Sequence, residues 1–227
     1  MTGSAWIVNT TGSIQSSGTP VDLVSDLGAA QQQPTFFGRL VFKPGRKHRI
    51  VVEGMPFTVD GYNVVNRTIV YRGQTFDVHE TVRSAASFNY VFAGYQYDLL
   101  SGVMGHLGLS AGGAYVDAGG RITSVETGNT GAKTETLGLP LAGIEGRLFP
   151  LPGHRILTVE GGLRGMSVGS YGSYFEAQGS GGVNLGHFAL LAGYRSMHPD
   201  LHASSGANPS GVDAHLRGPI FSVQWRW

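Results

Sequence analysis

The sequence predicts an all-β protein: a closed, antiparallel, up-and-down transmembrane β-barrel of about ten strands. Glycine is abundant, at 36 of 227 residues, and only 14% of residues are charged, against about a quarter in ordinary soluble domains. No stretch approaches the roughly 18 consecutive apolar residues that a membrane helix needs. Strand-like segments recur along the chain between turn signals. Because only helices and closed barrels satisfy all backbone hydrogen bonds in lipid, these observations favour a barrel.

Composition also limits the alternatives. A secreted soluble all-β domain would account for the composition alone about equally well. The net charge of +1 and the absence of a basic cluster give no support for a nucleic-acid partner. The absence of cysteine excludes disulfides and thiolate metal sites. Nothing marks a boundary between two cores, so we expect a single domain over residues 1–227.

The N-terminal residues lack the features of an export signal. The segment Met1–Trp6 has neither a basic region nor an apolar stretch. A protein of this class must be exported, so we expect the mature form of an exported chain whose signal peptide is absent from this sequence. If Met1 is the natural start, this argument is much weaker.

Ten strands are expected from the runs of alternating residues, and the first of them is the weakest. An even number suits a single-chain bacterial barrel with both termini on one side, and eight strands is the alternative count. The expected strands are Ala5–Ser13, Phe36–Lys43, Lys47–Asp60, Thr81–Leu100, His106–Ile122, Thr134–Phe149, Arg155–Val168, Ser173–Asn184, His187–Met197 and Ala214–Trp227.

Short and long connections alternate along the chain. Short turns are expected at Lys43–Lys47, Ser101–Gly105, Leu151–His154 and Asn184–Gly186. Longer loops are expected at Gln15–Pro34, Gly61–Glu80, Glu126–Lys133 and Pro199–Asp213, with a tighter turn at Ser170–Ser173. Short periplasmic turns and long extracellular loops are typical of outer-membrane barrels.

Period-2 alternation assigns a face to each side chain. In Val82–Phe92 we expect Phe88, Tyr90 and Phe92 to face lipid and the odd-numbered polar residues to face inward. The alternation in Arg155–Met166 and His187–Tyr194 is equally clear. It slips near Pro140–Glu145, where Leu137, Leu139 and Leu141 share the face of Glu145 and Arg147, and a β-bulge there would restore it.

Extending the alternation inward predicts a luminal charge network, joined by Gln178 and Gln224. Charged side chains cost about 2–4 kcal/mol each at the lipid midplane, so they are expected in the lumen, where opposite charges pair. The mixed signs favour a structural, occluded interior over an open one, with a small, weakly anion-selective pore as the alternative. The predicted residues are Arg39, Arg49, Glu53, Arg83, Glu145, Arg147, Glu160, Arg164, Glu176, Arg195 and Arg226.

The last strand carries a family resemblance. Pro219–Trp227 alternates outward Phe221, Val223, Trp225 and Trp227 with polar residues and ends on an aromatic residue. It resembles the C-terminal strand of Gram-negative outer-membrane proteins, and the whole plan is similar to small barrels of the outer-membrane protein A, X and W kind, with two more strands. The resemblance implies a bacterial outer-membrane location, contact with membrane lipids, and recognition of the last strand by the barrel-assembly machinery.

A second polar cluster lies near the last hairpin, with Asp77 and His79 as further candidates on an earlier loop. Ten-stranded outer-membrane proteases carry Asp and Asp–His pairs at the rim that activate water, and the match here is loose. No helix brings the histidines onto one face and the spacing fits no familiar metal site, so no metal and no cofactor are predicted. The cluster is His198, Asp200, His202, Asp213 and His215.

Two loop segments have patterns of their own. Thr68–Val78 alternates about Arg72-Gly73-Gln74, which predicts a β-hairpin. It either rises above the membrane and exposes Tyr71 and Phe76 to an extracellular partner of unknown kind, or caps the barrel mouth. Val21–Gly28 is expected to form a short helical turn that folds over or into the mouth.

We therefore expect a non-enzymatic outer-membrane barrel with a structural or surface-interaction role. A small passive pore and a hydrolase at the rim are the alternatives. Membership in such a structural class does not choose among these functions.

Overall fold

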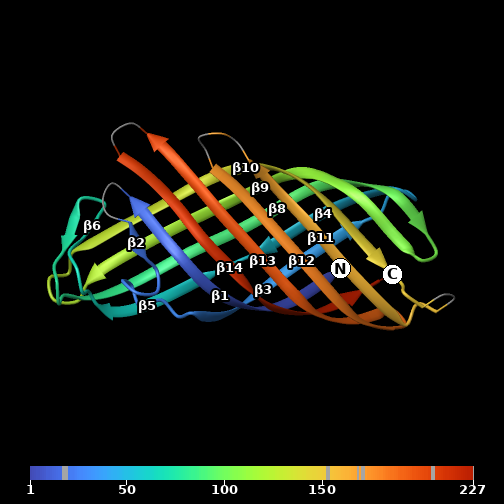
Figure 1. Ribbon diagram of the computed structural model, residues 1–227, viewed down its shortest axis with the longest axis horizontal. Coiled ribbons are helices and arrows are strands. Elements are labelled where there is room, and N and C mark those ends of the chain that lie inside the picture. Colours follow the sequence, from blue (N-terminus) through green and yellow to red (C-terminus); the bar gives the residue numbers. More distant parts are fainter. Residues whose placement is uncertain (17–19, 152–153, 168, 170–171, 206–207, 227) are drawn as a thin grey trace.

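The computed structural model describes residues 1–16, 20–151, 154–167, 169, 172–205 and 208–226, and the side chains of these except 16 and 202–210. Its regular elements are all β-strands (Figure 1). Among the described residues, no helix is long and apolar enough to cross a membrane. The strands are β1 (Thr2–Ser16), β2 (Val21–Asp22), β3 (Gln32–Phe42), β4 (His48–Met55), β5 (Thr58–Val64), β6 (Ile69–Tyr71), β7 (Gln74–Phe76), β8 (Thr81–Gly102), β9 (Gly105–Ser124), β10 (Thr130–Leu148), β11 (Leu157–Ser167), β12 (Gly172–Leu185), β13 (Phe188–Ser205) and β14 (Asn208–Trp225).

The main sheet closes on itself. Antiparallel pairs run in the order β1–β3–β4–β8–β9–β10–β11–β12–β13–β14, and β14 pairs with β1 over most of its length. The strands β6 and β7 form a separate two-stranded sheet. Of the twelve strands in this sheet, β2 adds a two-residue pairing only, and β4 and β5 are two halves of one segment that both pair with β8. Ten segments therefore form the wall. The ten-stranded closed barrel is confirmed, and the eight-stranded alternative is wrong.

The two ends of the barrel differ as predicted. Both termini lie at one end together with the short connections, which we call the turn end (Figure 1). The opposite end, which we call the loop end, carries β2, the β6–β7 hairpin and the longer connections. Two loop predictions need correction. Residues 199–213 belong mostly to the paired strands β13 and β14. The loop predicted at residues 126–133 is a shorter turn between Ser124 and Thr130. In both places the strands continue beyond the segment in which apolar and polar residues alternate.

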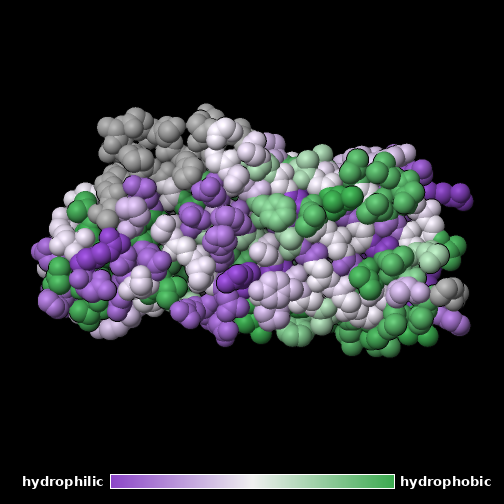
Figure 2. Space-filling model, in the orientation of Figure 1, coloured by the Kyte–Doolittle hydropathy of each residue, from purple (hydrophilic) through white to green (hydrophobic). Residues whose placement is uncertain are grey.

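On the face shown in Figure 2, the outer wall is largely apolar over the half of the barrel nearer the turn end, in what we call the apolar band, and the described part of the loop half is largely polar. Exposed aromatic side chains border this band. Tyr115, Phe175 and Tyr194 end it toward the loops, and Phe188 and Trp225 lie at its other edge. Aromatic girdles at both edges of an apolar band are the pattern of a membrane-spanning barrel. Trp227, the predicted terminal aromatic, lies outside the described residues.

Strand β8 shows that its predicted faces were inverted. Phe88, Tyr90 and Phe92 are buried inside the barrel, and Val91 and Tyr95 face outward. The prediction assumed that the aromatic face of a barrel strand meets lipid. The loop half of this interior is instead filled by apolar side chains, so the more apolar face of β8 points inward there.

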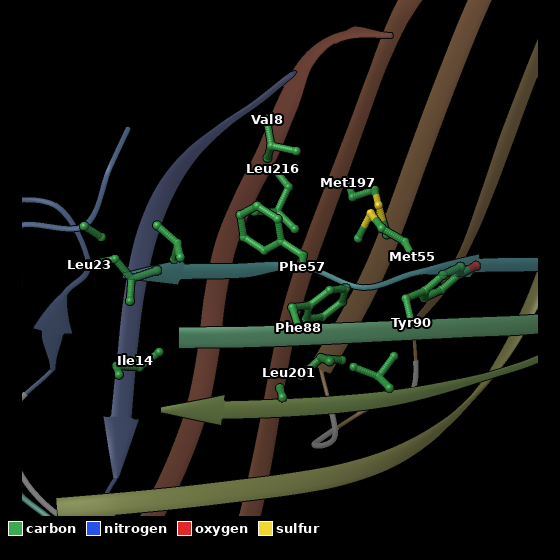
Figure 3. Packing of buried hydrophobic residues seen from close by; sticks show 14 of the residues in the cluster. Val8, Ile14, Leu23, Met55, Phe57, Phe88, Tyr90, Met197, Leu201 and Leu216 are labelled. Carbon is green, nitrogen blue, oxygen red and sulfur yellow. The ribbon is translucent and has the colours of Figure 1, made fainter. Parts of the chain in front are cut away.

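These inward side chains form an apolar plug in the loop half, with contributions from several walls (Figure 3). The same plug explains the slip predicted on β10. Leu139 and Leu141 are buried inside the barrel on the face of Glu145, and the β9–β10 register is continuous. The predicted bulge is therefore absent there, and the register shift lies in β8 between Asp98 and Leu100. Labelled members of the plug in Figure 3 include Val8, Ile14, Leu23, Met55, Phe57, Phe88, Met197, Leu201 and Leu216.

Two segments cover the loop end: the β6–β7 hairpin and the turn that follows β2. We call these two segments the mouth cover. The predicted hairpin is present as β6 and β7, and Arg72 and Gly73 at its turn both have positive φ, 56° and 73°, as a two-residue type I′ turn requires. Tyr71 and Phe76 are buried, so the hairpin caps the mouth and does not expose them. The helical turn predicted for residues 21–28 begins later, because Val21 and Asp22 form β2. Bonds from Asp26 N to the Asp22 carbonyl and from Gly28 N to the Val24 carbonyl close it, it ends at Gly28 with φ 64°, and Leu23 and Leu27 are buried.

Candidate functional site: a charge network across the barrel

Ten of the eleven predicted luminal residues, together with Gln178 and Gln224, line one cavity of about 390 Å³. Met1 and Lys43 line it as well, so it extends to the turn end. Arg83 is the exception and a correction: its side chain is exposed on the outer face of β8. This error follows directly from the inverted assignment of that strand, because Arg83 shares its face with Val91.

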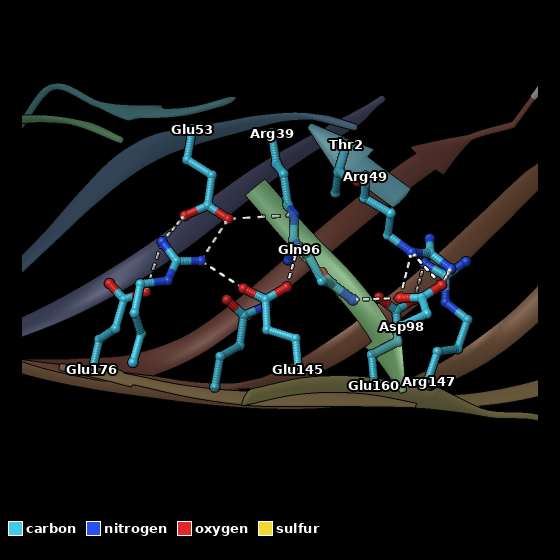
Figure 4. Close-up of polar contacts among 12 residues, drawn as sticks. Thr2, Arg39, Arg49, Glu53, Gln96, Asp98, Glu145, Arg147, Glu160 and Glu176 are labelled. Carbon is cyan, nitrogen blue, oxygen red and sulfur yellow. Dashed lines mark hydrogen bonds and ion pairs between the residues drawn. The ribbon is translucent and has the colours of Figure 1, made fainter. Parts of the chain in front are cut away.

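Arg164 on β11 lies at the centre of the network. Its Nη1 is 3.0 Å from Glu53 Oε2 on β4 and 3.3 Å from Glu176 Oε1 on β12. Its Nη2 is 2.6 Å from Glu145 Oε1 on β10. Figure 4 shows the three glutamates converging from different parts of the wall. Arg164 is only 4% exposed, so a single buried guanidinium connects three strands.

Two further arginines complete this central group. Arg39 on β3 pairs with Glu53, at 3.3 Å, and with Glu145. Arg195 on β13 lies 3.3 Å from Glu176 Oε2 and stacks over the ring of Phe37, 3.9 Å from its centroid. Three arginines thus face three glutamates, and the charges of the central group balance. Tyr174 donates a 2.7 Å hydrogen bond to Glu176.

A second pair lies nearer the turn end. Arg49 on β4 binds Asp98 on β8 through Nε, at 2.9 Å and 3.0 Å from the two carboxylate oxygens, and through Nη2 at 2.8 Å. Gln96 donates a further 2.9 Å bond to Asp98. Sequence reasoning missed Asp98 and Gln96, although both lie at even positions of β8. The sequence contained a sign of the error. Asp98 has the same parity as Tyr90 and Phe92, and a carboxylate is costly on a lipid-facing side, so this face of β8 had to point inward.

A third group lies at the open end of the cavity. Arg147 Nη2 is 2.9 Å from Glu160 Oε1 and donates a 2.8 Å hydrogen bond to Gln224. Arg226 donates a 2.9 Å bond to the same Gln224 oxygen. With Arg83 removed and Asp98 added, the interior holds six of the predicted arginines and five acids. The predicted excess of arginine, which favoured anion selectivity, falls to one, while Lys43 and Met1 at the turn end add positive charge.

The network bridges opposite walls of the barrel. Arg39 on β3 and Glu145 on β10 are far apart in the sheet order, yet their side chains pair. Buried ion pairs are costly to desolvate, so their partners must remain together once formed. The ion pairs cross-link the walls of the lumen, and the guanidinium groups of the central group bind carboxylates of this same chain.

The mouth cover has its own ion pair outside the apolar band. Arg67 Nε donates a 3.1 Å bond to Asp26, and a second bond from Arg67 Nη2 reaches the other oxygen. Burial alone would raise the pKa of Asp26, but the bonds from Arg67 and from the Asp22 amide outweigh it and hold that pKa below its usual value. Arg67 also donates to the carbonyl of Pro20, so it connects the two cover segments.

The polar cluster of the last hairpin lies elsewhere. His198, Asp213 and His215 occupy the outer face of β13 and β14 instead of the mouth, and the side chain of His202 lies outside the described part of the chain. Asp77 and His79 are exposed before β8. Among the described residues, His198, Asp213 and His215 are the group of possible metal ligands whose atoms all lie within 4.8 Å of one another.

Comparison with known proteins identifies the fold. No family model and no curated protein matches the sequence. The crystal structure of outer membrane protease OmpT from Escherichia coli is similar with a TM-score of 0.61 and 8% identity, covering 99% of this chain and 96% of that one. Ail of Yersinia pestis, bound to the heparin analogue sucrose octasulfate, gives a TM-score of 0.39 at 9% identity, covering 97% of both chains. The likeness to OmpT shows that the chain has the fold of an outer-membrane β-barrel. At 8% identity it shows nothing about the function of this chain.

Proposed function

We propose that this chain is a closed, non-conducting β-barrel of a Gram-negative outer membrane, with a structural role and a capped polar platform on the cell surface. The observation that carries the proposal is the set of ion pairs that joins opposite walls at Arg164. These pairs cross the lumen at the depth where a pore would have to be open.

Two further features support a closed barrel. Above the network, the apolar plug contains fully buried side chains such as Trp6, Phe92 and Ile122. Above the plug, the mouth cover buries Ile69 and Phe76 of its hairpin. Ions crossing from the loop end would have to pass cover, plug and network in series, and an apolar constriction is itself a barrier to water and ions.

The outer-membrane location is supported by the apolar band with its aromatic borders and by the likeness to OmpT. In this orientation the turn end faces the periplasm and the loop end faces outward. Recognition by the barrel-assembly machinery belongs to the same proposal. It is supported by Phe221, Val223 and Trp225, which alternate outward on the last strand.

A non-enzymatic role is also part of the proposal. OmpT is a protease by its title, but the Asp–His pair of this chain, His198 and Asp213, lies on the outer wall with both side chains partly exposed. A hydrolase that uses a general base needs the base and the substrate together in one site. The mouth, where a substrate would enter, is instead covered by packed apolar side chains.

Planar-bilayer recording tests the proposal. The refolded barrel, shown to be folded by its shifted gel mobility before boiling, should give no steady single-channel conductance. An Arg164→Met variant serves as the comparison, because it removes the central cross-link while keeping an unbranched side chain in the lumen. A large, steady conductance from the unaltered protein, changed in ion selectivity by Arg195→Met, would replace the proposal with the small pore.

A further inference from the structure

We propose that His198, Asp213 and His215 form a binding site for a divalent transition-metal ion, of which Zn²⁺ is the type, on the outer wall of the last hairpin. The site lies beyond the proposed structural role and shares no residue with the charge network. Its ligands are two imidazoles and one carboxylate, a set that suits zinc and neighbouring first-row ions and does not suit calcium or magnesium, which prefer oxygen ligands.

The strand register brings the ligands together. On β13 and β14, Met197 is paired with Leu216 and Asp200 with Asp213, so the same register places His198 opposite His215. The two imidazole rings stack with centroids 3.8 Å apart. Asp213 precedes His215 by two residues and therefore shares its face. A sheet thus supplies the proximity that the linear spacing of these residues does not suggest.

The distances suit one shared ion. His198 Nε2 lies 3.2 Å from Asp213 Oδ1, and a ligand atom of His215 lies within 4.8 Å of both. Zinc–ligand bonds of about 2.0–2.2 Å at tetrahedral angles put neighbouring ligand atoms roughly 3.3 Å apart. His215 is exposed and His198 is half-buried, so a change of the His215 side-chain rotamer is the adjustment that the third metal bond requires.

The register also places a second carboxylate beside the site. Asp200 and Asp213 are directly paired across the two strands and both face outward. A divalent ion bound at Asp213 would add positive charge next to both carboxylates, and like charges directly opposite each other otherwise destabilise a sheet.

The site has a defined place in the barrel. Tyr194, at the edge of the apolar band, lies four residues before His198 on the same face of β13. His198 is also paired with Phe175, which ends the band on β12. The ion would therefore bind at the loop-side edge of the band and hold the two strands of the last hairpin together. This hairpin adjoins the β14–β1 seam, where the barrel closes.

Isothermal titration of Zn²⁺ into the detergent-solubilised barrel, without a histidine tag, tests the site. One ion should bind per chain, and His198→Ala or His215→Ala should weaken that binding by at least ~10-fold. Co²⁺ should give the intense visible absorption of low-coordinate cobalt, and these variants should remove it. His187→Ala, which removes an exposed histidine at the turn end, is the matched control and should change neither signal.

The outcomes separate clearly. Because the ligands are on the outer wall, the variants should keep the gel shift of a folded barrel, which excludes loss of the site by unfolding. Absence of Zn²⁺ binding by the folded, unaltered protein would overturn the proposal. Binding that persists at full strength in both His198→Ala and His215→Ala would also overturn it, since the ion would then bind elsewhere.

Discussion

Arg164 on β11 and Glu53 on β4 form a two-point ion pair through the interior of the barrel, with Nη1–Oε2 at 3.0 Å and Nη2–Oε1 at 3.2 Å. Strands β8, β9 and β10 separate these two strands in the sheet. The pair therefore joins two distant parts of the wall. Its loss would leave buried charge without compensation, and this determines the first prediction.

Replacing Arg164 by Met should destabilise the barrel by roughly 3–5 kcal/mol, because it leaves Glu53, Glu145 and Glu176 with one positive charge too few. Urea unfolding in detergent, followed by tryptophan fluorescence, measures the change. Arg83→Met is the matched control, since Arg83 is exposed on the outer face, and should change stability by no more than about 0.5 kcal/mol. Equal unfolding midpoints for the two variants would contradict a stabilising role for the network.

The corrected faces of β8 yield a second prediction. Ala93 points outward within the apolar band, and Asn89 points outward on its loop side. Ala93→Arg should cost about 2–4 kcal/mol and Asn89→Arg only about 0–1 kcal/mol, because the penalty for a charge depends on its depth in lipid. Unfolding from lipid vesicles measures both. A larger cost at Asn89 would mean that the membrane lies at a different height on the barrel.

Much of this fold could be predicted from the sequence. Local turn residues place the connections, and local alternation assigns the faces of most strands. The last strand is an example: Phe221, Val223 and Trp225 are exposed as expected. Strand β8 could not be predicted in the same way. Its inward Phe88 and Tyr90 depend on an apolar plug contributed by distant strands, and no local pattern distinguishes an apolar interior from lipid.

The site shows the same division. Arg164 and Glu176 were found because their neighbours Leu163 and Phe175 are clearly apolar and outward. Asp98 was missed because it follows the inverted face of β8. The pairing of His198 with His215 could not be predicted either. His198 lies one residue beyond the expected strand His187–Met197, and alternation within two strands does not fix the register between them.

The turn between β8 and β9 supplies a third prediction. Gly105 has φ 141°, and a Cβ added there would lie 1.9 Å from the carbonyl oxygen of Arg147. Gly105→Ala should therefore destabilise the barrel by roughly 1–3 kcal/mol, since both the dihedral angle and the contact oppose a side chain. Gly102→Ala, at the other side of the same turn, meets no atom within 4 Å and is the control. Equal thermal unfolding temperatures for the two variants would show that this turn adapts freely.

The mouth cover supplies a prediction about pH. The pKa of Asp26 is lowered in the folded protein, because the bonds from Arg67 and the Asp22 amide outweigh the effect of burial. The ionised Asp26 therefore stabilises the folded cover fully when the pH is above about 3.9, the pKa of an aspartate in the unfolded chain. This stabilisation is lost as the pH falls through the lower pKa of Asp26 in the folded protein. Asp26→Asn removes the charge at every pH. It should therefore loosen residues 20–31 at pH 7 and make little difference below the folded pKa.

Hydrogen–deuterium exchange of peptides from residues 20–31, corrected for the intrinsic effect of pH, measures this loosening. Asp60→Asn is the control, because Asp60 is exposed on β5 and its carboxylate belongs to neither cover segment. The difference between the unaltered chain and Asp26→Asn should close as the pH drops below about 4, while Asp60→Asn follows the unaltered chain throughout. A difference that persists undiminished at the lowest pH would show that Asp26 supports the cover by its shape and not by its charge.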